Sequence, residues 1–217
     1  MKLPFTLEQF LDVFRQYNIS IWPVQILLVI LALVATYFSI FKKPYSDKII
    51  LFVLTFFWLW MGIAYHLIYF SPINKAAIIF GSLFIIQSLL FFYFGVIKDK
   101  LGFQFRLNKY GITGMALIMF SLIVYPLTGY WLGHIYPSSP TFGLPCPTTI
   151  FTFGILLFSS TRIPPAIIII PFLWALIGFS AAFSLGIKED TSLLVSGLLS
   201  IVLIITRNKK LRQRLSN

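Results

Sequence analysis

Three side chains in this sequence have chemistry suited to binding a metal or reacting with a ligand. Cys146 is the only cysteine and lies between Pro145 and Pro147, and His66 and His134 are the only histidines. Thiolate sulfur and imidazole nitrogen are ligands that zinc and copper accept. A metal site built from these three residues is therefore one hypothesis that the sequence raises.

Such a site would need a further ligand, for which Tyr65, Tyr130, Glu189 and Asp190 are the candidates. None of the local spacings matches a ligand motif such as H-x-x-x-H or C-x-x-C. A histidine at a helix end more often donates a hydrogen bond to a carbonyl, and a single cysteine lacks a second thiol to pair with. The sequence favours structural roles for these residues and predicts no cofactor. It assigns no catalytic residue, because it lacks a recognisable nucleophile with its base or a nucleotide-binding loop.

The position of Cys146 follows from its two proline neighbours. Pro147 suits the first position of a helix, which places Cys146 at the N-cap, where the helix dipole stabilises a thiolate. Thr148 and Thr149 then lie in the first turn with their hydroxyls available.

The composition is that of a chain in a lipid bilayer, since 59% of the 217 residues are hydrophobic, 11% are charged and the mean hydropathy is +0.91. A chain in lipid must satisfy its backbone hydrogen bonds internally, so we expect an all-α bundle. Apolar runs predict about seven transmembrane helices, near residues 20–41, 49–70, 76–97, 112–133, 147–160, 165–185 and 191–206. The segment 147–160 is short, so six spans result if it is re-entrant.

The first 18 residues predict a separate amphipathic helix lying flat on the outer membrane face. Thr6 and Gln9 fit a capping box, and Phe5 and Phe10 occupy the positions of a hydrophobic staple. Residues 19–206 would form a single transmembrane domain, and residues 207–217 a basic cytoplasmic tail.

Basic residues predict the orientation. Thirteen of the 17 Lys and Arg residues fall in alternate segments that end with the tail, and basic residues are retained on the cytoplasmic side. With seven spans, the N-terminus would be outside and the C-terminus cytoplasmic. The net charge of +11 is therefore a topology signal, and a basic tail alone does not indicate nucleic-acid binding.

Few polar residues fall inside the predicted spans. The absence of Asp, Glu, Lys and Arg there argues against an ion-coupled pump with a buried carboxylate. Gln87 lies at mid-membrane and Gln25 near the start of the first span. An amide in lipid needs a partner, so we expect Gln87 to bond to Ser88 or to a carbonyl freed by Pro126 or Pro171, unless it contacts a substrate.

Weak internal similarity raises the hypothesis of a parallel repeat of three spans, one linker helix and three spans. WPVQI at 22–26 aligns with CPTTI at 146–150, and WLWMGIA at 58–64 aligns with FLWALIG at 172–178. Such a repeat would place a binding site between its halves.

Several segments resemble one known family along nearly the whole chain. GIAYH, FSPIN, YPLTGYWLGHIYP, PFLWALIGFSAAFSLGIKED and, most specifically, PCPTTIFTFG are similar to an uncharacterised family of bacterial multi-pass membrane proteins, classed as a domain of unknown function. The resemblance implies a bacterial inner-membrane location and assigns no chemistry to any residue.

The sequence therefore supports three functional hypotheses, in order. The first is binding or transport of a small solute through an outward-facing pocket with candidate residues Gln25, Tyr65, His66, Gln87, Tyr130, His134, Cys146 and Thr149. The second is a non-transporting membrane subunit or sensor that contacts a membrane protein partner or a second copy of itself. The third is a metal-binding protein or membrane-embedded enzyme that uses His66, His134 and Cys146.

Overall fold

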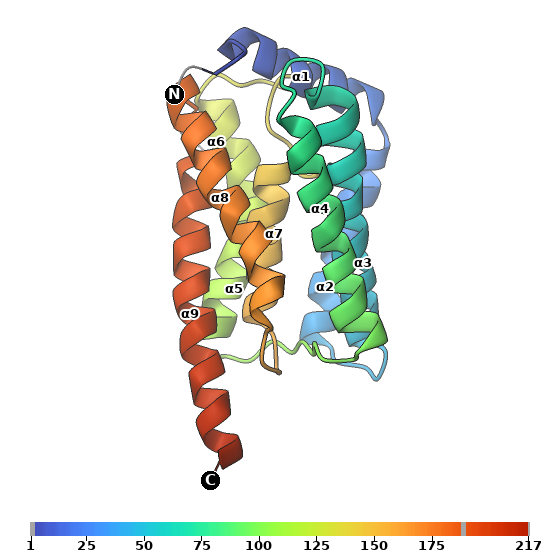
Figure 1. Cartoon of the computed structure of the whole chain (residues 1–217), viewed down its shortest axis with the longest axis vertical. Helices are drawn as coiled ribbons and strands as arrows, with labels where there is room; N and C mark the ends of the chain where they lie inside the picture. Colours follow the sequence, from blue (N-terminus) through green and yellow to red (C-terminus); the bar gives the residue numbers. More distant parts are fainter. Residues whose placement is uncertain (1–2, 188–189, 217) are drawn as a thin grey trace.

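The computed structural model describes residues 3–187 and 190–216, for 214–216 as backbone only, and this part of the chain is an upright helical bundle with one helix laid across its end (Figure 1). The helices in chain order are α1 (Leu7–Ser20), α2 (Val24–Ile40), α3 (Ser46–Trp60) with η1 (Met61–Phe70), α4 (Ala77–Phe91) with η2 (Phe92–Ile97), α5 (Lys109–Met119), η3 (Phe120–Val124), α6 (Tyr125–Trp131), α7 (Pro145–Leu157), α8 (Pro165–Leu185) and α9 (Thr191–Ser216). The three η segments are π-helical continuations of their helices. The predicted all-α membrane fold is confirmed.

Five helices in the described ranges are long and apolar enough to cross a membrane, and a sixth span results if α1 and α2 count as one. Those two helices meet at an angle of 86°. Each of the seven predicted segments is helical, but α7 has 13 residues, about 20 Å of helix. It is therefore shorter than the ~30 Å hydrocarbon core of a bilayer.

The predicted start of α1 is confirmed in detail. Thr6 and Gln9 exchange two hydrogen bonds of 2.9 and 3.2 Å between side chain and backbone, which completes the capping box. The rings of Phe5 and Phe10 stack with centroids 5.6 Å apart, as the hydrophobic staple predicts. Because these contacts are local, the sequence specifies them without reference to the rest of the fold.

Helix α7 forms the centre of the bundle, enclosed by other helices (Figure 1). Twelve of its 13 residues are buried, and it packs on α5, α8 and α9. At its crossing with α5, a Cβ on Gly114 would lie 2.7 Å from the carbonyl oxygen of Gly154, so only glycine permits this approach. Helix α2, which the repeat hypothesis pairs with α7, lies at the periphery with many exposed apolar side chains.

The end of the bundle opposite α1 is closed by residues 98–108. Gln104 N–H donates to the Phe158 carbonyl at 2.8 Å, and Ser160 N–H donates to the Gly102 carbonyl at 2.7 Å. These bonds fix the chain just after α7.

Helix α9 extends further than predicted. Residues 207–216, predicted as a basic tail, continue the helix, which projects below the bundle (Figure 1). Two charged residues flank the predicted span 191–206, and both are buried: Asp190 is 4% exposed and Arg207 is 8% exposed. The bundle interior therefore contains charges that the span prediction placed outside it.

Candidate functional site

A cavity of about 380 Å³ lies at the end of the bundle that α1 covers. Its walls come from the N-terminal segment and α1, the end of η1, the start of α4, the start of α7, and the end of α8 with Asp190. The aromatic residues that line it are Phe5, Phe10, Phe14, Tyr65, Phe70, Phe80, Tyr125 and Trp174. The volume and the apolar wall are typical of a small-molecule pocket, for which ~300–1,000 Å³ is usual.

The aromatic rings support one another at the top of the cavity. Phe70 makes edge contacts with Phe5 and Phe10 at centroid distances of 5.4 and 5.7 Å. Tyr65 stacks on Phe70 at 5.7 Å and contacts Phe14 at 6.3 Å. The rings therefore hold α1 against η1 and form a continuous apolar surface.

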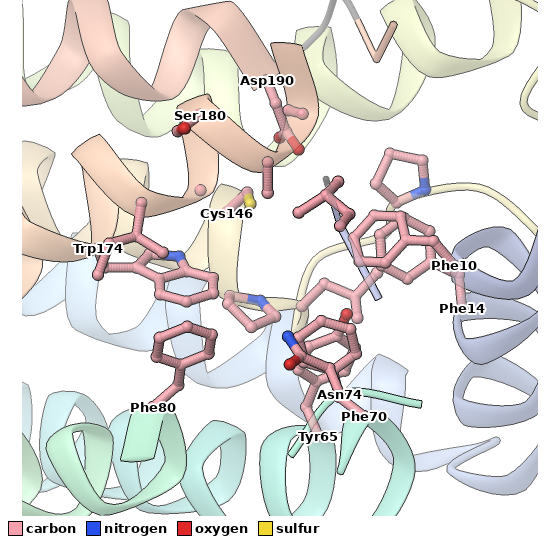
Figure 2. Close-up of a pocket in the computed structure, with 18 of the residues that line it drawn as sticks. Phe10, Phe14, Tyr65, Phe70, Asn74, Phe80, Cys146, Trp174, Ser180 and Asp190 are labelled. Carbon is pink, nitrogen blue, oxygen red and sulfur yellow. The ribbon is translucent and has the colours of Figure 1, made fainter. Parts of the chain in front are cut away.

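Polar groups gather at one place in this wall. The hydroxyl of Tyr125, which is fully buried, donates a hydrogen bond to the Asp190 carboxylate. The Cys146 thiol lies close enough to Asp190 and Tyr125 to interact with both. Figure 2 shows the Asp190 carboxylate and the Cys146 sulfur turned toward the space that the aromatic rings enclose. The cavity thus combines a carboxylate with a mainly apolar lining.

Cys146 reaches this position through the start of α7, two positions later in the helix than predicted. The N-cap is Leu144 and the first helical residue is Pro145, so Cys146 is the second residue of the helix and not its cap. Pro145 and Pro147 have no N–H to donate, and Thr148 uses its hydroxyl to accept the Gly143 N–H at 3.2 Å. Within the first turn of α7, Cys146 is therefore the residue whose side chain lies beside the Asp190 carboxylate.

The two ends of α7 have opposite charges beside them. Asp190 lies near its N-terminal turn, and Arg207 donates to the Leu157 carbonyl at 3.1 Å at its C-terminal turn. An anion at the N-terminus and a cation at the C-terminus complement the helix dipole. This arrangement stabilises a short helix that is too buried to use water at its ends.

His66 lies beside the cavity inside a cluster of rings. Its centroid is 4.6 Å from that of Phe84 and 4.9 Å from that of Trp174, and its side chain is fully buried. Neither ring nitrogen has a hydrogen-bond partner within the described residues. The expected bond from a helix-end histidine to a carbonyl is therefore absent.

The sequence-based candidates separate into those at the cavity and those elsewhere. Tyr65 and Cys146 line it. Tyr130 is 60% exposed, and Thr149 is buried with an unpartnered hydroxyl among the described residues. His134 lies half-buried in the segment after α6, where its backbone N–H donates to the Gly129 carbonyl at 2.9 Å.

The two glutamines have structural partners. Gln25 donates to Asn18 at 2.7 Å and to Thr141 at 3.0 Å, which ties the bend between α1 and α2 to the segment before α7. Gln87 donates to the Ile167 carbonyl at 3.1 Å. Pro171 leaves that carbonyl without its helical N–H, so the bond predicted for Gln87 is present.

No three His, Cys, Asp or Glu side chains within residues 3–187 and 190–216 lie together so that they could hold a metal ion. The metal arrangement considered for His66, His134 and Cys146 is therefore not formed there, because His66 is enclosed by rings while Cys146 faces the cavity. Glu189, the other carboxylate considered, lies outside the described residues.

Sequence reasoning did not identify Tyr125 as a cavity residue, favoured packing over pocket lining for Trp174, and considered Asp190 only as a metal ligand. Tyr125 stands directly before Pro126 within an apolar run, and no local pattern separates it from a packing residue. Asp190 did carry a signal, since it is an acidic residue immediately before the last apolar run. An acidic residue at this position favours the start of a helix. Its location in the fold is then set by where the N-terminus of that helix packs.

Comparisons with known proteins place the whole bundle in one family. No curated protein and no solved structure matches the chain. The model of a family of unknown function, DUF6064, matches residues 7–216, which include every helix and nearly all of the cavity wall. The protein is thus a member of the DUF6064 family.

Proposed function

We propose that the protein is a multi-pass membrane protein that binds a small organic cation with an apolar body in the cavity beneath α1. The observation that carries this proposal is the Asp190 carboxylate in a mainly apolar wall to which eight aromatic residues contribute. Such a site offers an apolar body a mainly apolar surface and offers a positive group both a carboxylate and ring faces.

Aromatic rings favour cations because the face of each ring is electronegative. A cation over such a face gains about 0.5–2 kcal/mol, and cages of several rings recognise quaternary ammonium groups. Tyr65, Phe70 and Trp174 supply rings from two sides of the cavity. The Tyr125 hydroxyl donates a hydrogen bond to the Asp190 carboxylate and brings no charge of its own.

Binding is favoured over passage through the bundle, because the core beyond the cavity is filled. Phe80 and Trp174 meet at 5.6 Å at its inner edge. Further along, the Trp58 and Phe84 rings lie 4.5 Å apart, and both are at most 1% exposed. A ligand-binding subunit or sensor therefore fits the geometry better than a channel.

The cavity would open on the non-cytoplasmic side of a bacterial inner membrane. Lys42, Lys98, Lys100 and Arg106 follow or precede helix ends opposite α1, and basic residues are retained in the cytoplasm. Helix α1 lies across the other end, where its exposed polar side chains suit an interfacial helix. The proposed orientation keeps the N-terminus outside and the C-terminus inside.

The test is binding of benzyltrimethylammonium to the full chain in lipid nanodiscs, measured by calorimetry. Neopentylbenzene has the same shape without the charge, and phenylacetate has the opposite charge. We expect the cation to bind most tightly. Asp190→Asn should weaken cation binding about tenfold or more, because a carboxylate and a cation ~4 Å apart near a protein surface attract by ~4 kcal/mol, and a loss of ~1.4 kcal/mol already raises the Kd tenfold.

Asparagine caps a helix as well as aspartate does, so Asp190→Asn removes charge without removing a helix-starting residue. Glu8→Gln is the matched control, because Glu8 is an exposed carboxylate of α1 outside the cavity lining. Equal binding of the cation and its neutral isostere, or equal effects of the two substitutions, would refute cation recognition.

A further inference from the structure

A second cavity lies at the other end of the bundle and has the opposite chemistry. It has a volume of about 370 Å³ and lies where the first turn of α5, the last turn of α7 and the end of α9 meet. Four basic residues line it, namely Arg106, Lys109, Arg207 and Lys210, and its lining in the described part of the chain contains no Asp or Glu. We propose that it binds the phosphate group of an anionic ligand.

Arg207 is the buried element of this site. Its guanidinium donates to the Leu157 carbonyl at 3.1 Å, but its Nε–H has no partner in the described residues, although the residue is only 8% exposed. The hydroxyl of Tyr110, whose ring lies 6.0 Å from the guanidinium carbon, is also buried without a described partner. Buried donors without acceptors are costly, so an acceptor-rich ligand in this cavity is favoured.

The surrounding chain is shaped to bring these donors together. Asn108 caps α5 and accepts the N–H groups of Tyr110 and Gly111 at 2.9 and 3.1 Å. A Cβ on Gly111 would lie 2.0 Å from the Arg106 carbonyl oxygen, so glycine is required for the segment to fold back on this turn. Because Asn108 already uses those backbone donors, side chains must provide the recognition.

A phosphate group matches this donor set better than other anions. Its oxygens accept several hydrogen bonds at once, and arginine and lysine are the side chains that recognise it. Lys109 and Lys210 are exposed and can close on a ligand from opposite sides, while Arg207 is fixed at the base. The phosphate could belong to a lipid headgroup or to a soluble compound, and the two sources are separable by experiment.

The experiment is native mass spectrometry of the full chain in detergent with three probes: dioctanoyl phosphatidic acid, dioctanoyl phosphatidylcholine and inorganic phosphate. We expect binding of phosphatidic acid or inorganic phosphate above that of the zwitterionic lipid. Phosphatidic acid alone would identify a lipid headgroup, whereas binding of inorganic phosphate would identify a soluble source. Either result supports the site. If neither phosphatidic acid nor inorganic phosphate binds, the proposal is wrong.

The variant that decides is Lys109→Gln/Lys210→Gln, because both side chains are exposed and their loss should not disturb folding. It should weaken binding of the phosphate probe about tenfold or more. The matched control is Lys98→Gln/Lys100→Gln, which removes two exposed lysines from the same end but outside the cavity lining. Equal losses in the two variants would overturn a specific site and indicate only diffuse surface charge.

Discussion

The side-chain amide of Gln87 donates a hydrogen bond to the carbonyl oxygen of Ile167 across the interface between α4 and α8. Pro171 has no N–H and therefore leaves this carbonyl unpaired within its own helix. The glutamine replaces the missing helical donor, and the pair connects two helices in a region without water.

Replacing Gln87 with leucine should lower the free energy of unfolding by about 1 kcal/mol, because the Ile167 carbonyl loses its partner. In a Pro171→Ala background the same change should have almost no effect, since the substituted alanine would supply the helical N–H. Denaturant unfolding in mixed micelles gives the free energy of unfolding of all four proteins in this double-mutant cycle. Additive effects of the two substitutions would contradict the explanation.

Replacing Arg207 with methionine should lower the free energy of unfolding by about 1–3 kcal/mol, because the last carbonyls of α7 lose a charged donor. Arg212→Met is the control, since Arg212 is exposed on the same helix. Thermal unfolding in detergent gives both values, and the expected order is a large loss for Arg207 and little change for Arg212.

Alanine at Gly114 or Gly154 should force α5 and α7 apart, because each new Cβ would lie 2.7–2.8 Å from a backbone oxygen. We expect a loss of about 1–3 kcal/mol for each substitution. Ala116→Leu enlarges an exposed position of α5 and serves as the control. If the glycine variants unfold at the control's temperature, the close crossing is not required for stability.

Cys146 is half-buried beneath the aromatic side chains at the top of the cavity, so N-ethylmaleimide should label its thiol slowly in the folded protein. Phe5→Ala should raise the labelling rate several-fold, because Phe5 packs on Phe10 and Phe70 at the top of the cavity. A time course by mass spectrometry reports this single thiol directly.

The labelling control places a thiol outside the cavity. In a Cys146→Ala/Ser20→Cys chain the new thiol is exposed at the end of α1. Its labelling rate should be high and should not respond to Phe5→Ala. An equal increase in the labelling rates at positions 146 and 20 would show that Phe5→Ala loosens α1 as a whole and does not specifically open the top of the cavity.

Features of this fold that depend on neighbours in the sequence were predictable. The capping box of Thr6 and Gln9 uses residues three apart. The Gln87 bond spans 80 residues, and a carbonyl freed by Pro171 was one of several partners expected for an amide in lipid. Nearly any surrounding structure would preserve the capping box, whereas the Gln87 bond also requires α4 and α8 to pack together.

The cavity could not be predicted in the same way, because it depends on distant parts of the chain. Tyr125 and Asp190 are 65 residues apart, and neither shows a pattern that indicates the other. Helix α7 has no charged residue and is apolar apart from its threonines and its cysteine, and such a sequence suits a helix facing lipid as well as a helix at the protein core. Tertiary packing alone decides between these two.

The contacts at both ends of α7 set an order of events during synthesis. Asp190 immediately precedes α9 and Arg207 lies within it, so both follow α7 in the chain. When α7 leaves the ribosome it is too short to span the bilayer, and neither charged group that complements its ends has yet been made. The contacts at both ends of the central helix can therefore form only after translation of α9 as far as Arg207.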